Sequence, residues 1–102
     1  MKEFTNKFDI IEYAENIGKY DYEIAKVEGK PAMLSSTILP FEDIFRYPIE
    51  EIVRDVLSEM GFKDENKIDD ISMYIGAEMS GVLMDMIEQE ANVLIYTAGL
   101  DF

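Results

Sequence analysis

The sequence predicts an α+β domain, and three observations lead to that fold class. Apolar residues recur with a helical period in three segments and alternate with polar residues in others, and Gly or Pro separates most of these segments. The expected order is α-β-β-α-α-β, with a three-stranded, mainly antiparallel sheet packed with helices. A length of 102 residues suits one core, so residues 1–102 are expected to form a single acidic domain.

The first expected element is a helix that begins after Thr5 and ends near Gly18. Thr5 is a good N-cap, Gly18 is a common stop, and Phe4 could pack back against the first turn. The apolar face of this helix would carry Phe8, Ile11, Ala14 and Ile17.

A β-hairpin is expected next, because the apolar period changes from that of a helix to two. Tyr20, Tyr22 and Ile24 alternate with their neighbours in the way that is typical of a half-buried strand. Residues 28–31 contain Gly29 and Pro31 and predict a turn, and residues 32–39 predict the returning strand.

The second half predicts two more helices and a last strand. After Pro40, residues 41–45 could form one helical turn, and Pro48 suits the first turn of a helix that ends at Gly61. Asp64 or Asn66 would cap a long helix to about residue 91, and residues 93–97 would form the final strand. The apolar stripes expected to face the core are Ile49, Ile52, Val53, Val56, Leu57 and Met60 on the first of these helices, and Ile68, Ile71, Ile75, Met79, Val82 and Met86 on the second. Gly76, Ala77, Ser80 and Gly81 form a small-residue segment suited to close packing or a kink.

The net charge of the chain limits the classes of partner that it can bind. The chain carries −13 at neutral pH, and residues 41–102 hold two Arg and two Lys against fifteen acids. Such a chain should repel DNA, RNA and anionic membranes and attract the proteins that bind them. It also has no Cys, His or Trp, so it lacks disulfides, thiolate zinc sites and the side chains most used in nucleophilic and near-neutral acid–base catalysis.

Acidic residues follow regular lines on both expected helices. Glu51, Asp55 and Glu59 are spaced four apart, so they rise by about 6 Å per step beside the apolar stripe, and only Arg54, paired with Glu50, offers local relief. The residues assigned to a partner-binding surface are Glu42, Asp43, Glu51, Asp55, Glu59, Asp64, Glu65, Asp70, Tyr74, Glu78, Asp85 and Glu88. A solvated surface that also benefits from the helix dipoles is the alternative interpretation, but such surfaces usually mix both signs of charge.

The sequence gives little support for metal binding or catalysis. Residues 64–75 are rich in oxygen ligands but fail as a calcium-binding EF-hand, because Asp69 stands where Gly is needed and Ile75 where a bidentate Glu belongs. Paired carboxylates could hydrolyse a glycoside, but a chain this short has little room for the cleft. We therefore expect no enzyme activity, no metal site and no cofactor.

In size, charge and lack of catalytic side chains, the chain resembles small acidic inhibitors carried by phages and plasmids, such as anti-CRISPR, anti-restriction and uracil-glycosylase inhibitor proteins. The likeness is one of class and rests on no shared motif. It implies a protein inhibitor that mimics nucleic acid and occupies the basic groove of a host nuclease or related DNA- or RNA-acting protein, with Met73, Tyr74 or Met84 adding apolar contacts.

Two alternatives stay open at this point. One is an immunity protein or antitoxin that neutralises a nuclease toxin, and the other is a regulatory adaptor that docks through an apolar Met and Tyr helix face. The final strand, residues 93–97, could pair with a second copy if it lies at the sheet edge. With no signal-peptide pattern after Met1 and no apolar run near the ~20 residues of a membrane span, a cytoplasmic location is expected.

Overall fold

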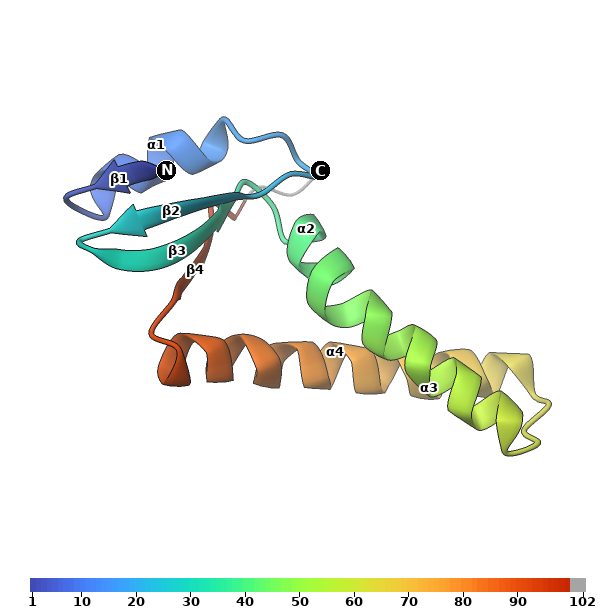
Figure 1. Ribbon diagram of the computed structural model, residues 1–102. Helices are drawn as coiled ribbons and strands as arrows, with labels where there is room; N and C mark the ends of the chain where they lie inside the picture. Colours follow the sequence, from blue (N-terminus) through green and yellow to red (C-terminus); the bar gives the residue numbers. More distant parts are fainter. Residues whose placement is uncertain (100–102) are drawn as a thin grey trace. The chain divides into compact units, whose positions relative to one another are not determined.

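The computed structural model describes residues 1–99 and has an α+β fold, as predicted, with one sheet and several helices (Figure 1). The chain divides into two compact units. The sheet unit comprises Met1–Pro40 and the described part of Asp85–Phe102, and the helical unit comprises Phe41–Met84.

The sheet has four strands in the order β1-β2-β3-β4, where three mainly antiparallel strands were expected. The strands are β1 (Lys2–Phe4), β2 (Glu23–Val27), β3 (Lys30–Ser35) and β4 (Leu94–Thr97). Only β2 and β3 pair antiparallel, whereas β1 pairs parallel with β2 and β4 parallel with β3. The reason is the connections: a two-residue turn permits antiparallel pairing, while a helix lies between the strands of each parallel pair.

The expected element order is also wrong at its start, because residues expected to precede the first helix form β1. Phe4 is buried in the sheet, where its carbonyl accepts a hydrogen bond from the Glu28 N–H (2.8 Å). The helix α1 (Phe8–Glu15) therefore begins later than predicted, and the side chain of Asn6, not Thr5, accepts the N–H groups of Phe8 and Asp9 (3.0 and 3.2 Å). A three-residue strand is too short to show a period of two, which explains why the sequence pattern missed it.

The hairpin turn is confirmed, but the buried face of β2 differs from the apolar alternation. Glu28 and Gly29 both have positive φ (53° and 79°), as a tight hairpin turn of this handedness requires. Ala25 and Val27 face the core, whereas Ile24 lies on the exposed side. The core cluster consists of Phe4, Ile10, Ala25, Val27, Ala32 and Leu34. Its small alanines leave room for Phe4 and Ile10, so on β2 the small Ala25 lies inside the core while the bulkier Ile24 lies outside it.

The loop between α1 and β2 is held by buried hydroxyl groups at the end of β3. Ser35 donates a hydrogen bond to the backbone carbonyl of Asp21 (3.0 Å), and Thr37 donates one to that of Lys19 (2.5 Å). Both hydroxyl residues are fully or almost fully buried. The loop is thereby fixed against the sheet.

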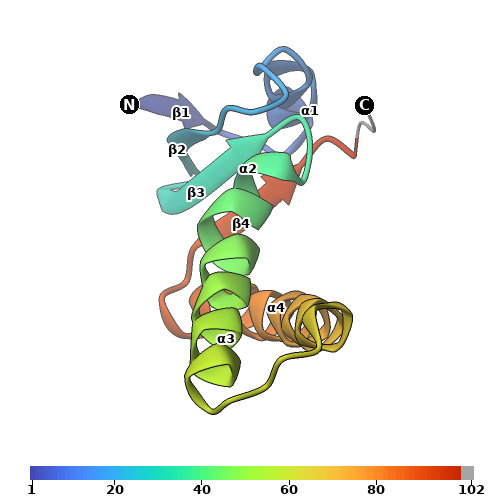
Figure 2. The same cartoon turned by 90° about the vertical axis from the view of Figure 1, so that its right-hand side faces the viewer.

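The helical unit contains α2 (Leu39–Phe41) only in part, then the π-helical turn η1 (Glu42–Arg46), α3 (Tyr47–Glu59) and most of α4 (Glu65–Glu90). Pro48 lies in the first turn of α3, as predicted, and Gly61 follows the helix with a φ of 94°. Asp64 accepts the N–H of Lys67 (3.2 Å) and so caps α4, one of the two caps expected. Within this unit α3 and α4 cross at an angle and do not run side by side along their length (Figure 2).

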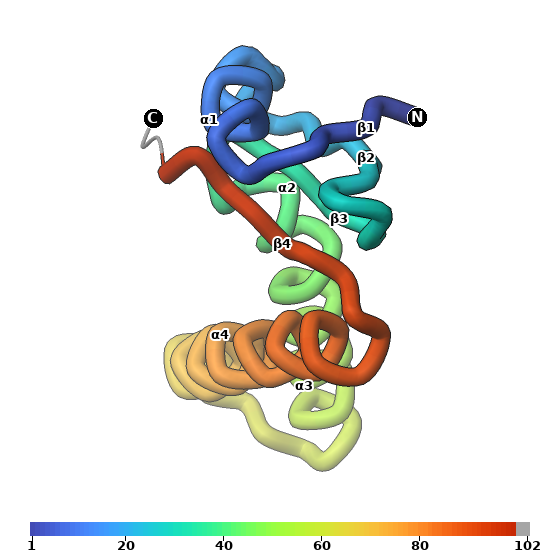
Figure 3. Tube along the Cα trace, turned by 90° about the vertical axis from the view of Figure 1, so that its left-hand side faces the viewer, coloured from blue at the N-terminus to red at the C-terminus, as the bar shows by residue number. Residues whose placement is uncertain are grey.

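The chain leaves the sheet after β3 and returns to it in β4, which lies at a sheet edge (Figure 3). Asn92, with a φ of 56°, ends the helical conformation after α4, a role that Asn tolerates well. Among residues 1–99, no helix combines the length and the apolar character that crossing a membrane would require.

Candidate functional site

The contact between α3 and α4 is built on a buried carboxylate. Glu50 on α3 is only 4% exposed, and its oxygens meet Nε of Arg46 (2.9 Å) and Nη2 of Arg54 (3.5 Å). Arg54 in turn donates from Nε to Asp69 on α4 (3.0 Å). The Glu50–Arg54 pair agrees with the pairing expected from their i,i+4 spacing, and the network satisfies a charge that would otherwise be costly to bury.

Small residues on α4 make this polar contact close. Ser72 and Gly76 are buried, one turn apart and one turn beyond buried Ile68. A methyl group on Gly76 would overlap the side chain of Glu50 and approach the Arg46 carbonyl. The small-residue segment predicted for close packing is therefore confirmed at Gly76, whereas nothing lies close to Gly81.

Because the helices meet over their polar and small-residue flanks, the predicted apolar stripes are not fully buried. On α3, Ile52, Val56 and Met60 are 62, 49 and 68% exposed, and we call these three residues the apolar line. On α4, Met79, Val82 and Met86 are exposed as well. The expectation that these stripes face the core is wrong for these six residues. The physical reason is that crossing helices cover each other only where they meet.

The three predicted carboxylates Glu51, Asp55 and Glu59, which we call the acidic line, are all exposed on α3. Each precedes a member of the apolar line by one residue, so the two lines lie about 100° apart around the helix and run together along it. The structure thus places an acidic line beside an apolar line on one exposed side of α3.

The other predicted residues have separate roles or lie elsewhere. Glu42 is half-buried, accepts a hydrogen bond from the Tyr47 hydroxyl (2.9 Å) and pairs with Arg46 (3.8 Å), so it is partly used within the unit. Those that the structure leaves exposed in the helical unit are Asp43, Asp64, Glu65, Asp70, Tyr74 and Glu78. Asp85 and Glu88 belong to the sheet unit, so the long acidic face expected along the last helix is divided between the units.

The sequence pattern does not identify the apolar line as surface, because the same residues fit a stripe that faces the core. The sequence did carry a signal for the residues that make the contact between α3 and α4. Glu50 and Arg54 are spaced to pair, and Gly76 belongs to the small-residue segment. An ion pair opposite a small-residue segment is a contact that does not need the apolar stripes.

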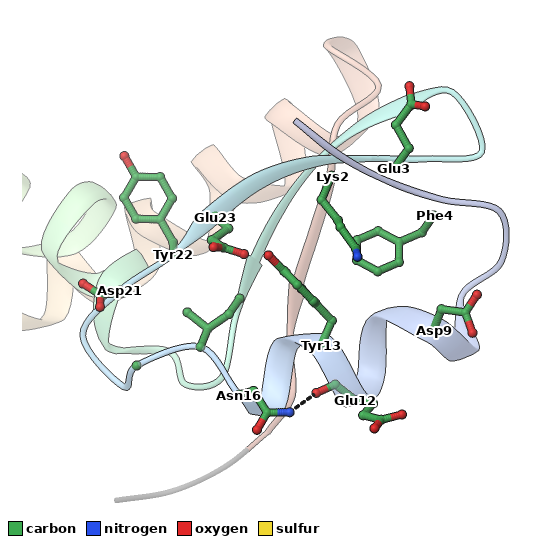
Figure 4. A pocket seen from close by; sticks show the side chains of 12 residues that line it. Lys2, Glu3, Phe4, Asp9, Glu12, Tyr13, Asn16, Asp21, Tyr22 and Glu23 are labelled. Atoms are coloured by element: carbon green, nitrogen blue, oxygen red, sulfur yellow. Dashed lines mark hydrogen bonds between the residues drawn. The ribbon is translucent and has the colours of Figure 1, made fainter.

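The sheet unit also contains a pocket that no sequence pattern indicates. A hollow of about 830 Å³ lies between β1, α1 and the fixed loop before β2 (Figure 4). Its lining includes five carboxylate residues, Glu3, Asp9, Glu12, Asp21 and Glu23. Within it, the ammonium group of Lys2 lies 5.9 Å from the ring centre of Phe4 and 5.4 Å from that of Tyr13. The two rings meet edge to face, with centres 5.3 Å apart.

Each unit holds a tyrosine whose ionisation is suppressed by a carboxylate. Hydrogen bonding to Glu42 raises the pKa of Tyr47 above its usual value of 10.0, and hydrogen bonding to Glu23 raises the pKa of Tyr13 in the same way. Both phenols therefore remain protonated hydrogen-bond donors at neutral pH.

Residues 1–99 contain no cluster of three or more acidic side chains arranged to hold a metal ion. No protein-family model, no curated protein and no solved structure matches this chain.

Proposed function

We propose that this chain is a small protein inhibitor that docks its helical unit onto the basic, nucleic-acid-binding surface of a nuclease or related DNA- or RNA-acting protein. The proposal includes a cytoplasmic location, where such targets act. The observation that carries it is the exposed apolar line of α3 beside the exposed acidic line. Contiguous exposed apolar side chains are a common mark of protein-binding surfaces, and the adjacent carboxylates favour a basic partner.

The two lines would contribute in different ways. Carboxylates steer a basic partner into encounter and raise the association rate, whereas desolvated apolar side chains slow dissociation. Along one helix the acidic line rises about 6 Å per carboxylate, which is sparser than the 3.4 Å between phosphates on one DNA strand. We therefore propose a mixed apolar and acidic surface in preference to a close copy of a phosphate backbone.

An affinity capture from bacterial lysate at low salt, with elution by duplex DNA, tests the proposal. The charge variant is Glu51→Gln, Asp55→Asn and Glu59→Gln, and its matched control is Glu15→Gln, Glu28→Gln and Glu90→Gln, three exposed carboxylates of the sheet unit. We expect a nucleic-acid-acting protein that DNA displaces. Three exposed ion pairs at about 0.5 kcal/mol each imply roughly a tenfold loss of affinity in the charge variant. Full affinity in the charge variant, or capture that DNA does not disturb, would overturn the proposal.

A second candidate function is a regulatory adaptor that binds an apolar partner surface. Tyr74 is 69% exposed on α4, and Met73 and Met79 are exposed on the same helix, which favours apolar docking without a charged target. The adaptor would be supported if the captured partner stays bound at high salt and in the presence of duplex DNA, and if a Tyr74→Ser variant no longer captures it.

A further inference from the structure

The pocket of the sheet unit has the chemistry of a site for an organic cation. Aromatic ring faces attract an ammonium group, and carboxylates around them add favourable charge. Phe4 and Tyr13 provide the rings, and five acidic residues stand in the lining against a single lysine. A volume of about 830 Å³ lies within the range of small-molecule sites.

The pocket already holds one cation, which belongs to the chain itself. The ammonium of Lys2 lies within 6 Å of both ring centres, at 5.4 and 5.9 Å, as Figure 4 shows beside Phe4. Lys2 shows which group the rings accept: a primary ammonium at the end of an alkyl chain. Because its side chain is exposed and its backbone is fixed by pairing with Ala25, that side chain can leave the pocket without unfolding β1.

The walls of the pocket are held in place. Phe4 is buried in the core, and Tyr13 lies against it on α1. The loop that carries Asp21 and Tyr22 is tied to the buried hydroxyls of Ser35 and Thr37. A preorganised site loses less entropy when it binds a ligand.

We propose that this pocket binds a primary alkylammonium group, and that Lys2 occupies the site until such a ligand displaces it. The group could come from a free polyamine or from a lysine side chain of another protein, which present the same chemistry. This site lies in the sheet unit and does not depend on the function proposed for the helical unit.

The test is an NMR titration of the labelled chain with spermidine and, separately, with Nα-acetyl-lysine amide, at about 0.15 M salt to screen general attraction. We expect both ligands to shift the ring resonances of Phe4 and Tyr13 more than they shift the side-chain resonances of the acidic line. Spermidine binding alone would point to a free polyamine, and binding of both would include a lysine side chain. Shifts spread evenly over the acidic surfaces would overturn the proposal.

Variants separate a site from general charge attraction. Lys2→Gln removes the internal occupant, and Lys67→Gln makes the same charge change on an exposed residue of the helical unit. We expect Lys2→Gln to tighten spermidine binding by about threefold, as loss of a competing cation–π contact implies, and Lys67→Gln to leave it nearly unchanged. Equal effects of the two substitutions would contradict the proposal.

Substitutions at Tyr13 test the ring itself. We expect Tyr13→Leu to weaken binding by about threefold and Tyr13→Phe, which keeps the ring, to retain it. If Tyr13→Leu fails to fold, the comparison of Lys2→Gln with Lys67→Gln still decides the matter. Loss of binding in Tyr13→Phe equal to that in Tyr13→Leu would show that the ring is not the determinant.

Discussion

The sheet unit and the helical unit are held together by different kinds of contact. In the sheet unit the core cluster is apolar, with Ala25, Leu34 and Ile10 almost completely inaccessible. In the helical unit the contact between α3 and α4 is built on Glu50, its arginines and Gly76, while Ile52 remains exposed. The difference teaches that an amphipathic stripe identifies an apolar face of a helix but does not establish that the chain buries that face.

The largest expected difference between the units concerns truncation of an apolar side chain. Leu34→Ala removes a fully buried side chain and should lower the free energy of unfolding by about 2–5 kcal/mol. Ile52→Ala removes one that is 62% exposed and should cost less than about 1 kcal/mol. Urea denaturation followed by circular dichroism measures both. A similar loss in the two variants would mean that the apolar line is buried in solution.

Two glycines of α4 give a matched pair for the polar contact. Gly76→Ala forces Glu50 aside and should destabilise the protein by about 1–3 kcal/mol, despite the better helix propensity of alanine. Gly81→Ala meets open space and should stabilise it by up to about 1 kcal/mol. Thermal unfolding of the two variants gives the comparison. A stabilised Gly76→Ala variant would show that the helices do not meet as described.

The smallest expected effect is on tyrosine ionisation at high pH, where the pKa of Tyr47 in the helical unit can be compared with that of Tyr13 in the sheet unit. The raised pKa of Tyr47 means that its protonated form stabilises the fold; this contribution is complete below pH 10.0 and is lost as pH rises through the folded-state pKa. Glu42→Ala should lower the pKa of Tyr47 and leave that of Tyr13 unchanged, and Glu23→Ala should do the reverse. A titration followed by NMR of the tyrosine Cζ nuclei resolves the residues. Shifts of both pKa values in either variant would indicate a general effect of net charge.

Local signals in the sequence predicted much of the fold. The predicted turn at Gly29, the helix start at Pro48, the helix end at Gly61 and the cap at Asp64 are all found in the structure. Such signals are reliable because turns and caps depend on neighbouring residues. The strand β1 and the parallel pairings were missed because they depend on partners far along the chain. The buried face of β2 was misjudged because burial depends on what packs against each face of the strand, and the face that carries Ala25, not Ile24, meets the core.

For the candidate site, the sequence identified the acidic line but misjudged its neighbours. Glu51, Asp55 and Glu59 are exposed together, as their spacing predicts. The exposure of Ile52 and Val56 follows from how two helices cross, which no single-helix periodicity encodes. The pocket around Lys2 joins a strand, a helix and a loop, so its parts carry no common local pattern.

The placement of β4 beside β3 has a consequence for the order of folding. The β2–β3 hairpin is closed by two residues, so its pairing has a small entropic barrier and hairpins of this kind form within microseconds. Ala32 and Leu94, in contrast, are register partners separated by the entire helical unit. Contacts of such long sequence separation form late, because the loop-closure entropy must be lost before they become favourable. We therefore expect the hairpin to serve as the template on which β4 is added last, so that the sheet is completed only after the intervening helices have shortened the chain between β3 and β4.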